Sequence, residues 1–175
     1  MTPSRQPAPD APTTSLGLAS DGPATTRAIA AALAGALVDG DVLVLTGDLG
    51  AGKTCFAQGL GVGLGVEDRI TSPTFTLANR YRGRLTLHHL DVYRLDSEAD
   101  AADLGLEELL DDGVTVIEWG DRIPGLLPER RFTLAFRYPE VSAGTDADPD
   151  RREIVVDGPI GERGLDGLLA PWVER

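Results

Sequence analysis

The sequence has little cysteine, few aromatic side chains and no long apolar run. Its one cysteine, Cys55, excludes an intramolecular disulfide, and no group of Cys and His residues has the spacing of a zinc site. No apolar stretch approaches the roughly 20 residues that a membrane-spanning helix needs. Residues 1–14 are rich in proline, alanine and threonine and lack the apolar segment of a signal peptide. We therefore expect a cytoplasmic protein without a membrane segment, with a disordered tail over residues 1–14 and a single domain over residues 15–175.

Basic side chains are also scarce. The chain has 16 Lys and Arg against 28 Asp and Glu, which gives a formal net charge of -12. Binding of nucleic acid depends on several basic side chains that neutralise phosphates. The charge balance therefore argues against a protein that binds nucleic acid by itself, although a basic partner could hold an RNA near it.

Lysine is the rarest charged residue: Lys53 is the only one, and the other fifteen of the 16 basic side chains are arginine. Lys53 lies in the segment 47–54, Gly-Asp-Leu-Gly-Ala-Gly-Lys-Thr, which matches the pattern G-x-x-x-x-G-K-[ST] of phosphate-binding P-loops. A lysine ammonium is a compact charge on a flexible stem and can reach between two phosphates, whereas the planar arginine guanidinium prefers flat bidentate partners. The sequence therefore predicts a site for a nucleoside triphosphate.

Apolar runs and turn signals predict alternating strands and helices. The helix-start signal Asp-Gly-Pro at 21–23 precedes an alanine-rich helix that we expect to end near Gly40. The apolar run 42–45 is typical of a buried strand, and a helix is expected from Lys53 towards Gly65, so the P-loop has the strand–loop–helix context that it requires. Further strands are predicted at 15–20, 75–81, 85–91, 114–117, 131–138 and 152–156. Further helices are predicted at 165–173 and at 97–110, the second interrupted by Gly105. The predicted fold class is α/β: a three-layer fold like that of P-loop NTPases, with a mixed, partly antiparallel central sheet.

The P-loop itself is expected to hold the phosphates. Backbone N–H groups of residues 50–54 would surround the β-phosphate at the positive end of the following helix. Lys53 would reach the β- and γ-phosphates, and the Thr54 hydroxyl would ligate Mg²⁺. Nucleotide contacts are predicted for eight consecutive residues: Asp48, Leu49, Gly50, Ala51, Gly52, Lys53, Thr54 and Cys55.

A P-loop site also needs a carboxylate at a strand end, which holds Mg²⁺ directly or through water. Glu118 follows the buried run 114–117, and Asp91 closes the predicted strand 85–91. Two acids at two strand ends suit a division of labour, in which one holds the metal and the other orients the attacking water. These positions alone leave open which acid does which.

Hydroxyl groups and histidines near these acids are weaker signals. Thr71, Ser72 and Thr74 form a candidate switch loop whose hydroxyls sense the γ-phosphate, although an ordinary hydrophilic turn is the better interpretation of this segment taken alone. His88 and His89 are neighbours on a predicted strand, so their side chains point to opposite faces and cannot share a metal ion. For His88 we expect a hydrogen-bonded structural role.

Together these motifs resemble the TsaE family, the small bacterial ATPases of tRNA threonylcarbamoyladenosine synthesis. The resemblance covers roughly residues 15–142. The motifs that carry it, in order, are 47–54, Ser-Pro-Thr-Phe-Thr-Leu at 72–77, His-x-Asp-x-Tyr-Arg-Leu at 89–95, Leu-Gly-x-Glu-Glu at 104–108 and Ile-Glu-Trp at 117–119. The resemblance implies an ATP-dependent protein that binds the TsaD and TsaB proteins and supports threonylcarbamoyl transfer to adenosine 37 of tRNA. It implies contact with tRNA only through that complex.

The resemblance also implies roles for single residues. Thr54 and Glu118 would hold Mg²⁺, Lys53 would bind the phosphates of ATP, and Asp91 would assist hydrolysis. The expected catalytic residues are Asp91 and Lys53. These assignments choose between the two acids, a choice that their positions left open.

Three further positions follow from the same resemblance. Thr25, before the first predicted helix, matches a position near the nucleotide, and Trp119 would lie beside the nucleotide and report its occupancy. Cys55 departs from the family, which usually has threonine there. Its backbone N–H can still donate, but a weak thiol replaces a good hydroxyl donor.

The sequence also bears on three other functions. A small-molecule kinase would carry a lid of arginines that converge on the transferred phosphate, and Arg80, Arg82 and Arg84 lie close together on a predicted hairpin. A regulatory GTPase is excluded because its N-K-x-D or T-K-x-D motif needs a second lysine. A nucleotide-gated adaptor, whose slow hydrolysis only resets an assembly, overlaps with the resemblance and stays open.

Overall fold

The structure is a computed structural model that describes residues 14–95, 97–102, 105–110, 112–139 and 148–174. Its strands are β1 (Thr14–Ser20), β2 (Asp41–Gly47), β3 (Ala78–Tyr81), β4 (Leu87–Asp91), β5 (Val114–Glu118), β6 (Phe132–Arg137) and β7 (Arg152–Gly158). Its helices are α1 (Pro23–Ala34), α2 (Lys53–Gly63), α3 (Glu98–Ala102), α4 (Leu106–Leu110) and α5 (Leu165–Leu169). Short 3-10 turns lie at Gly120–Arg122, Pro124–Leu126, Gly161–Arg163 and Ala170–Trp172.

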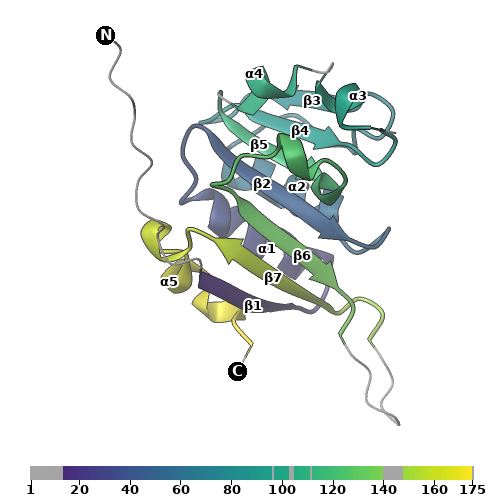
Figure 1. Cartoon of the computed structure of the whole chain (residues 1–175). Helices are drawn as coiled ribbons and strands as arrows, with labels where there is room; N and C mark the ends of the chain where they lie inside the picture. Colours follow the sequence, from purple (N-terminus) through teal and green to yellow (C-terminus); the bar gives the residue numbers. More distant parts are fainter. Residues whose placement is uncertain (1–13, 96, 103–104, 111, 140–147, 175) are drawn as a thin grey trace.

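All these strands form one mixed sheet, with the order β1-β7-β6-β2-β5-β4-β3 (Figure 1). The central strands β6, β2, β5 and β4 are parallel, while β3 and the pair β7 and β1 add antiparallel edges. Parallel strands bring their carboxyl ends to the same edge of a sheet, and ligands of open α/β sheets bind at that edge. In the described part of the chain, none of the helices has both the length and the apolar character needed to cross a bilayer.

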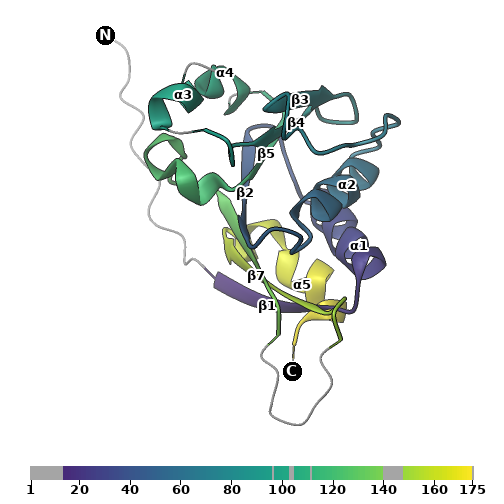
Figure 2. The same cartoon turned by 90° about the vertical axis from the view of Figure 1, so that its right-hand side faces the viewer.

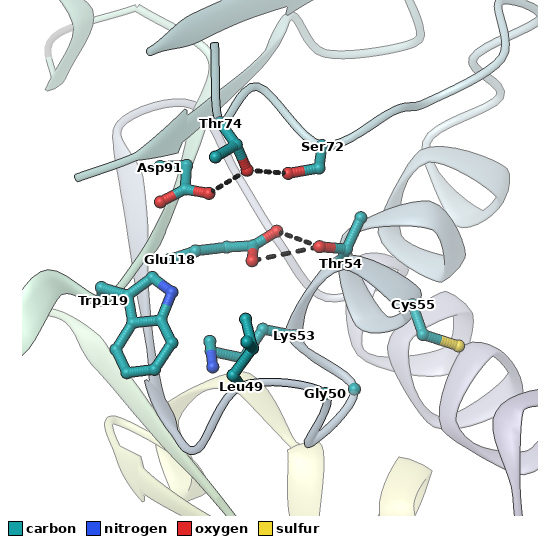
Figure 3. Close-up of a pocket in the computed structure, with 11 residues that line it drawn as sticks. Leu49, Gly50, Lys53, Thr54, Cys55, Ser72, Thr74, Asp91, Glu118 and Trp119 are labelled. Carbon is teal, nitrogen blue, oxygen red and sulfur yellow. Dashed lines mark hydrogen bonds between the residues drawn. The ribbon is translucent and has the colours of Figure 1, made fainter. Parts of the chain in front are cut away.

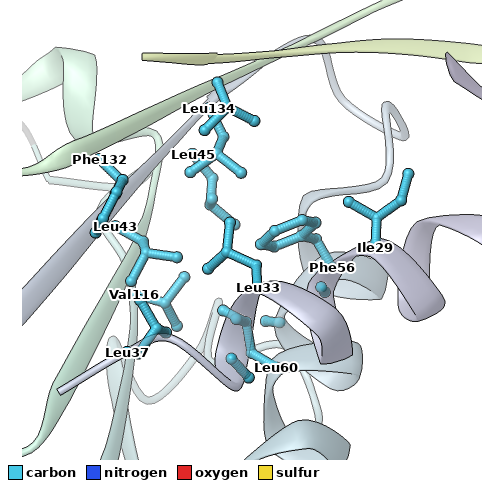
Figure 4. Close-up of a cluster of buried hydrophobic side chains, with 14 of the residues drawn as sticks. Ile29, Leu33, Leu37, Leu43, Leu45, Phe56, Leu60, Val116, Phe132 and Leu134 are labelled. Atoms are coloured by element: carbon cyan, nitrogen blue, oxygen red, sulfur yellow. The ribbon is translucent and has the colours of Figure 1, made fainter. Parts of the chain in front are cut away.

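Helices cover both faces of the sheet (Figure 2). The α1, α2 and α5 face is the larger, and its core joins these helices to inward-facing side chains of the strands (Figure 4). The α3 and α4 face is thinner, with a smaller cluster around Val42, Val44 and Ile117. Because side chains alternate along a strand, Leu43 and Leu45 of the same β2 strand belong to the other cluster. The prediction of a three-layer α/β fold with a mixed sheet is confirmed.

The first helix is shorter than predicted. It ends at Ala34 instead of near Gly40, because the chain turns at Gly35, whose N–H donates to the Ala32 carbonyl at 3.1 Å. The guanidinium of Arg84 donates to carbonyl groups at this end of the helix, including that of Leu37. Alanine and leucine favour continuation locally, but a side chain from the hairpin satisfies the carbonyls of the helix end.

The helix predicted at 97–110 is present as two short helices, α3 and α4, and Gly105, at φ 70°, directly precedes α4. Two strands and the last helix also begin or end differently from the prediction. The strand predicted at 75–81 begins at Ala78, since the Leu77 N–H turns back to the Pro73 carbonyl at 2.6 Å. The strand predicted at 85–91 begins at Leu87. At the C-terminus the helix gives way to a 3-10 turn over Ala170–Trp172. The prediction of a disordered tail over residues 1–14 lies outside the described residues, apart from Thr14, which begins β1.

Glycines in α2, for which the sequence suggests no function, allow α1 and α2 to pack closely. A Cβ added at Gly59 would lie 2.7 Å from the Ala30 Cβ, and one at Gly63 would lie 2.6 Å from the Ala34 Cβ. Both separations are shorter than atoms tolerate. The glycines therefore let the backbones of the two helices approach, although glycine costs a helix about 1 kcal/mol relative to alanine.

Candidate functional site

The candidate site is a cavity at the carboxyl ends of β2, β4 and β5. It has a volume of about 200 Å³. Figure 3 shows the side chains that line it. The P-loop leaves the end of β2, Asp91 is the last residue of β4, and Glu118 is the last residue of β5. The cavity is lined by Leu49, Gly50, Gly52, Lys53, Thr54, Cys55, Ser72, Thr74, Asp91, Glu118 and Trp119.

Lys53 is held at one end of this cavity and is 4% exposed. Its Nζ donates to the carbonyl oxygens of Gly47 at 2.6 Å and Asp48 at 2.8 Å, and it lies 3.6 Å from the centroid of the Trp119 ring. Burial lowers the pKa of Lys53, while the carboxylates of Glu118 and Asp91 act in the opposite direction. The Lys53 amine is therefore hydrogen-bonded to the P-loop backbone, and the carboxylates of Glu118 and Asp91 line the same cavity.

Thr54 and Glu118 form a second pair. The Thr54 hydroxyl lies 2.8 Å from Glu118 Oε1 and 3.1 Å from Oε2, so the carboxylate accepts this donor with both oxygens. The two residues are 64 positions apart in the sequence, and α2 and β5 bring them together. A hydroxyl and a carboxylate are hard oxygen donors of the kind that Mg²⁺ prefers.

Asp91 belongs to a chain of hydroxyl groups. Its Oδ2 accepts from the Thr74 hydroxyl at 2.7 Å, and the Thr74 and Ser72 hydroxyls are 2.6 Å apart. Its Oδ1 accepts from the Tyr93 backbone N–H at 3.0 Å. The structure thus brings two of the three candidate switch residues to the cavity, whereas Thr71 is not among the residues that line it.

Trp119 closes the side of the cavity next to Lys53. Its backbone adopts the left-handed conformation with φ 63°, which is uncommon for a large side chain, and its N–H donates to the Leu45 carbonyl at 2.8 Å. Its ring packs against Tyr93 with a centroid separation of 4.9 Å. The turn after β5 therefore holds the ring against the P-loop amine.

The residues present fit a magnesium-bound triphosphate. Gly52, the N-cap of α2, has φ 111°, and no side chain caps this end of the helix. The first backbone N–H groups of α2 therefore have no side-chain acceptor and can donate to a phosphate. No group of three or more His, Cys, Asp and Glu residues arranged for a metal occurs in the described part of the chain. Mg²⁺ is commonly bound by one or two protein oxygens together with substrate phosphates and water, and Thr54 and Glu118 supply such a pair.

Cys55 and Thr25 lie on the α1 side of the P-loop. The Cys55 thiol lies 3.3 Å from the Pro23 carbonyl, to which it donates, and accepts from the Arg27 guanidinium at 3.2 Å. Burial raises the pKa of Cys55, and the Arg27 charge opposes this shift. Thr25 lies on the first turn of α1 but does not line the cavity, so its predicted contact with the nucleotide stays a prediction. Asp48 and Ala51 do not line the cavity, so their predicted contacts with the nucleotide stay predictions; the Ala51 N–H donates to the Asp48 carbonyl at 3.1 Å.

Comparison with known proteins adds the family. The family model described as "Threonylcarbamoyl adenosine biosynthesis protein TsaE" matches residues 20–146. The chain belongs to the TsaE family. Among curated TsaE relatives, the tRNA threonylcarbamoyladenosine biosynthesis protein of Treponema pallidum is 55% identical over 102 residues, covering 58% of this chain and 76% of the relative. The relative of the same name from Bacillus subtilis is 42% identical over 143 residues, covering 81% of this chain and 84% of the relative.

A solved structure agrees with this assignment. The crystal structure of YdiB from Bacillus subtilis matches with a TM-score of 0.71 and 32% sequence identity, covering 91% of this chain and 97% of YdiB. The resemblance to TsaE drawn from the sequence motifs is therefore confirmed. The roles assigned to single residues remain predictions, which the geometry above makes specific.

In this TsaE chain, sequence reasoning missed one residue of the site. His89 Nε2 lies 2.8 Å from Glu118 Oε1, and the side chain is 0% exposed. The expected structural histidine, His88, lies 3.5 Å from Asp112 Oδ2, and its buried Nε2 has no hydrogen-bond partner among the described residues. Burial lowers the pKa of His88, with the Asp112 charge opposing. The alternation of faces along β4 puts His89 on the same side as Asp91 and was the available signal.

Proposed function

We propose that this chain is a Mg²⁺-dependent ATPase of tRNA threonylcarbamoyladenosine biosynthesis, which acts with the TsaD and TsaB proteins in threonylcarbamoyl transfer to adenosine 37 of tRNA. Family membership supports the process, and the cavity supports the chemistry. The observation that carries the proposal is the convergence on one cavity of the Lys53 amine, the Thr54 hydroxyl, and the carboxylates of Asp91 and Glu118. These four groups come from three separate segments of the chain.

The P-loop side of the cavity would bind the triphosphate. Lys53 would exchange its two carbonyl partners for β- and γ-phosphate oxygens, and the N–H groups at the start of α2 would donate to the β-phosphate. Thr54 and Glu118 would hold Mg²⁺, which when bound supplies charge stabilisation to the phosphates. The Thr54 hydroxyl would then turn from the Glu118 carboxylate towards the metal.

The opposite side of the cavity would act on the attacking water. The Asp91 carboxylate is held by the Thr74 hydroxyl and the Tyr93 N–H, so its orientation is fixed before a water arrives. A carboxylate held in this way can orient a water and accept its proton, which is a role of general bases in hydrolysis. Because Ser72 and Thr74 also line the cavity, this loop is placed to respond to the γ-phosphate.

The small-molecule kinase is less well supported. Arg80 pairs with Asp112 at 3.1 Å, next to the start of β5, whereas the cavity lies at its other end. Arg84 donates to the end of α1. Two of the three hairpin arginines that could have formed a lid thus have structural partners away from the phosphate site.

The test measures ATP turnover by the purified chain alone, with TsaD and TsaB, and with candidate phosphoryl acceptors, next to a pull-down with TsaD and TsaB. We expect slow turnover alone, association with the pair, and a higher rate in the complex. An adaptor would associate in an ATP-dependent way, with a rate that the complex does not raise. Turnover that requires a small-molecule acceptor would establish a kinase, and absence of association would leave a generic P-loop ATPase.

A further inference from the structure

We propose that His89 is a positioning residue that holds the Glu118 carboxylate in place for Mg²⁺. The inference rests on the proposed function, because it concerns the metal ligands of the same site. His89 opens the motif at 89–95, but the family resemblance gave it no role, and it does not line the cavity.

The sheet register places His89 directly beneath the two acids. On neighbouring parallel strands, Asp91 pairs with Glu118, and His89 pairs with Val116 two positions earlier. Residues two apart on a strand share a face, so His89, Asp91 and Glu118 all point to the face covered by α2, which carries Thr54. The buried imidazole of His89 therefore contacts the Glu118 carboxylate on its core side, and the cavity lies on the other side of that carboxylate.

Glu118 accepts two hydrogen bonds on one oxygen. Oε1 lies 2.8 Å from the Thr54 hydroxyl and 2.8 Å from His89 Nε2. A carboxylate only accepts, so Nε2 carries the hydrogen of this bond. If the Thr54 hydroxyl turned away from the carboxylate to ligate Mg²⁺, the bond from His89 would still hold Oε1. His89 would then keep the carboxylate in its orientation.

The burial of His89 points to a role beyond packing. The side chain is 0% exposed, and its Nδ1 is buried without a hydrogen-bond partner among the described residues. An unsatisfied buried polar atom destabilises a fold, so an apolar residue would serve the core better at this position. The bond from Nε2 to Glu118 is what an apolar residue could not supply. Hydrogen-bond partners behind metal ligands commonly tune metal affinity in this way.

The experiment compares three variants with the wild-type chain by calorimetric titration of ATP, over a series of Mg²⁺ concentrations and in EDTA. His89→Leu removes the donor, His89→Gln keeps an N–H near the place of Nε2, and His89→Asn keeps a polar amide that is too short to reach Glu118. We expect His89→Leu and His89→Asn to raise the Mg²⁺ concentration at which the enhancement of ATP binding is half-maximal. The increase should be about 10-fold or more, the usual effect of losing a hydrogen-bond partner of a metal ligand. We expect His89→Gln to stay near wild type, and ATP affinity in EDTA to be the same for all four proteins.

Each outcome separates the inference from the proposed function. If wild type binds ATP with Mg²⁺ and His89→Leu has the same Mg²⁺ requirement, His89 has no positioning role and the proposed function stands. If His89→Gln raises the Mg²⁺ concentration for half-maximal enhancement of ATP binding as much as His89→Leu does, the hydrogen-bond donor is not what holds Glu118, and the inference is wrong. Should His89→Leu fail to fold in a thermal unfolding control, the comparison of His89→Asn with His89→Gln decides. A wild-type chain that binds no ATP overturns both.

Discussion

At the scale of single residues, the P-loop amine occupies a space that is shaped for lysine. Its Nζ reaches two carbonyl oxygens within 2.8 Å and lies over the Trp119 ring, and the side chain is 4% exposed. An arginine at this position would bring a longer, planar head into the same space. We therefore expect Lys53→Arg to abolish measurable ATP binding in calorimetry although it preserves the charge.

Arg82→Lys, an exposed exchange on the hairpin, serves as the matched control for that variant and should bind ATP like wild type. Thermal unfolding shows whether both variants are folded. ATP turnover close to wild type in Lys53→Arg would contradict the argument that this site requires an ammonium.

The two acids of the cavity have different hydrogen-bond partners, which predicts different defects. Glu118 accepts from the Thr54 hydroxyl, which we propose as a ligand of Mg²⁺, so Glu118→Gln should weaken the enhancement of ATP binding by Mg²⁺. Asp91 accepts from Thr74 and Tyr93, so Asp91→Asn should leave ATP affinity nearly unchanged and lower turnover by about 10²–10⁴-fold, the usual contribution of a general base. Calorimetry with and without Mg²⁺ and steady-state turnover measure both effects. The reverse ranking would exchange the two roles.

Cys55 is a third residue whose environment predicts chemistry. Because burial raises its pKa, the fraction of thiolate at neutral pH is smaller than in free cysteine. We expect alkylation by iodoacetamide to be slower than for free cysteine at neutral pH and to accelerate as the pH rises towards the raised pKa. Mass spectrometry follows the reaction, and Cys55→Ser, which leaves no thiol, gives the background. Alkylation as fast as in free cysteine would show that the thiol is neither buried nor hydrogen-bonded as described.

At the scale of elements, the contact between α1 and α2 supports the P-loop, which ends where α2 begins. We expect Gly59→Ala to lower the free energy of unfolding by about 1–3 kcal/mol, the usual cost of overpacking, because the added methyl meets the backbone of Arg27 and the Ala30 side chain. Urea unfolding measures the change. The control is Gly167→Ala in α5, where an added Cβ meets nothing within 4 Å and helix propensity favours alanine. Equal stability of Gly59→Ala and wild type would show that the helices can move apart without cost.

Some elements could be predicted from local sequence, whereas some of their boundaries could not. The P-loop strand and helix, β2 and α2, and the acid-bearing strand β5 could be predicted, because apolar runs and glycine patterns lie within each segment. The end of α1 could not, since Arg84, some 50 residues away, helps to satisfy its last carbonyls. Nor could the turn at Pro73–Leu77, in which a backbone hydrogen bond and the positive φ of Leu77 override a β-favouring run. Tertiary partners decided these boundaries.

At the scale of the whole molecule, charge limits the partners. With a formal net charge of -12, the chain lacks the excess of basic side chains that neutralises a phosphate backbone. We expect the isolated chain to show no binding of tRNA in fluorescence anisotropy at physiological salt, and to approach tRNA only in the presence of TsaD and TsaB. Micromolar binding of tRNA by the chain alone would contradict this. Heparin, another polyanion, is tested in parallel and should likewise not bind the chain of net charge -12.

The sequence by itself determined the P-loop with its single lysine, the alternation of strands and helices, and the family. Each of these depends on motifs or apolar runs that lie within short contiguous segments. Tertiary structure decided which side chains meet. The pairs Thr54 with Glu118, Thr74 with Asp91, and His89 with Glu118 join segments 64, 17 and 29 residues apart. Such pairs depend on the order of strands in the sheet and on the face to which each side chain points. The alternation of side chains puts His89 on the same face as Asp91, but its partner Glu118 is set by the register of β4 and β5, which only the fold shows.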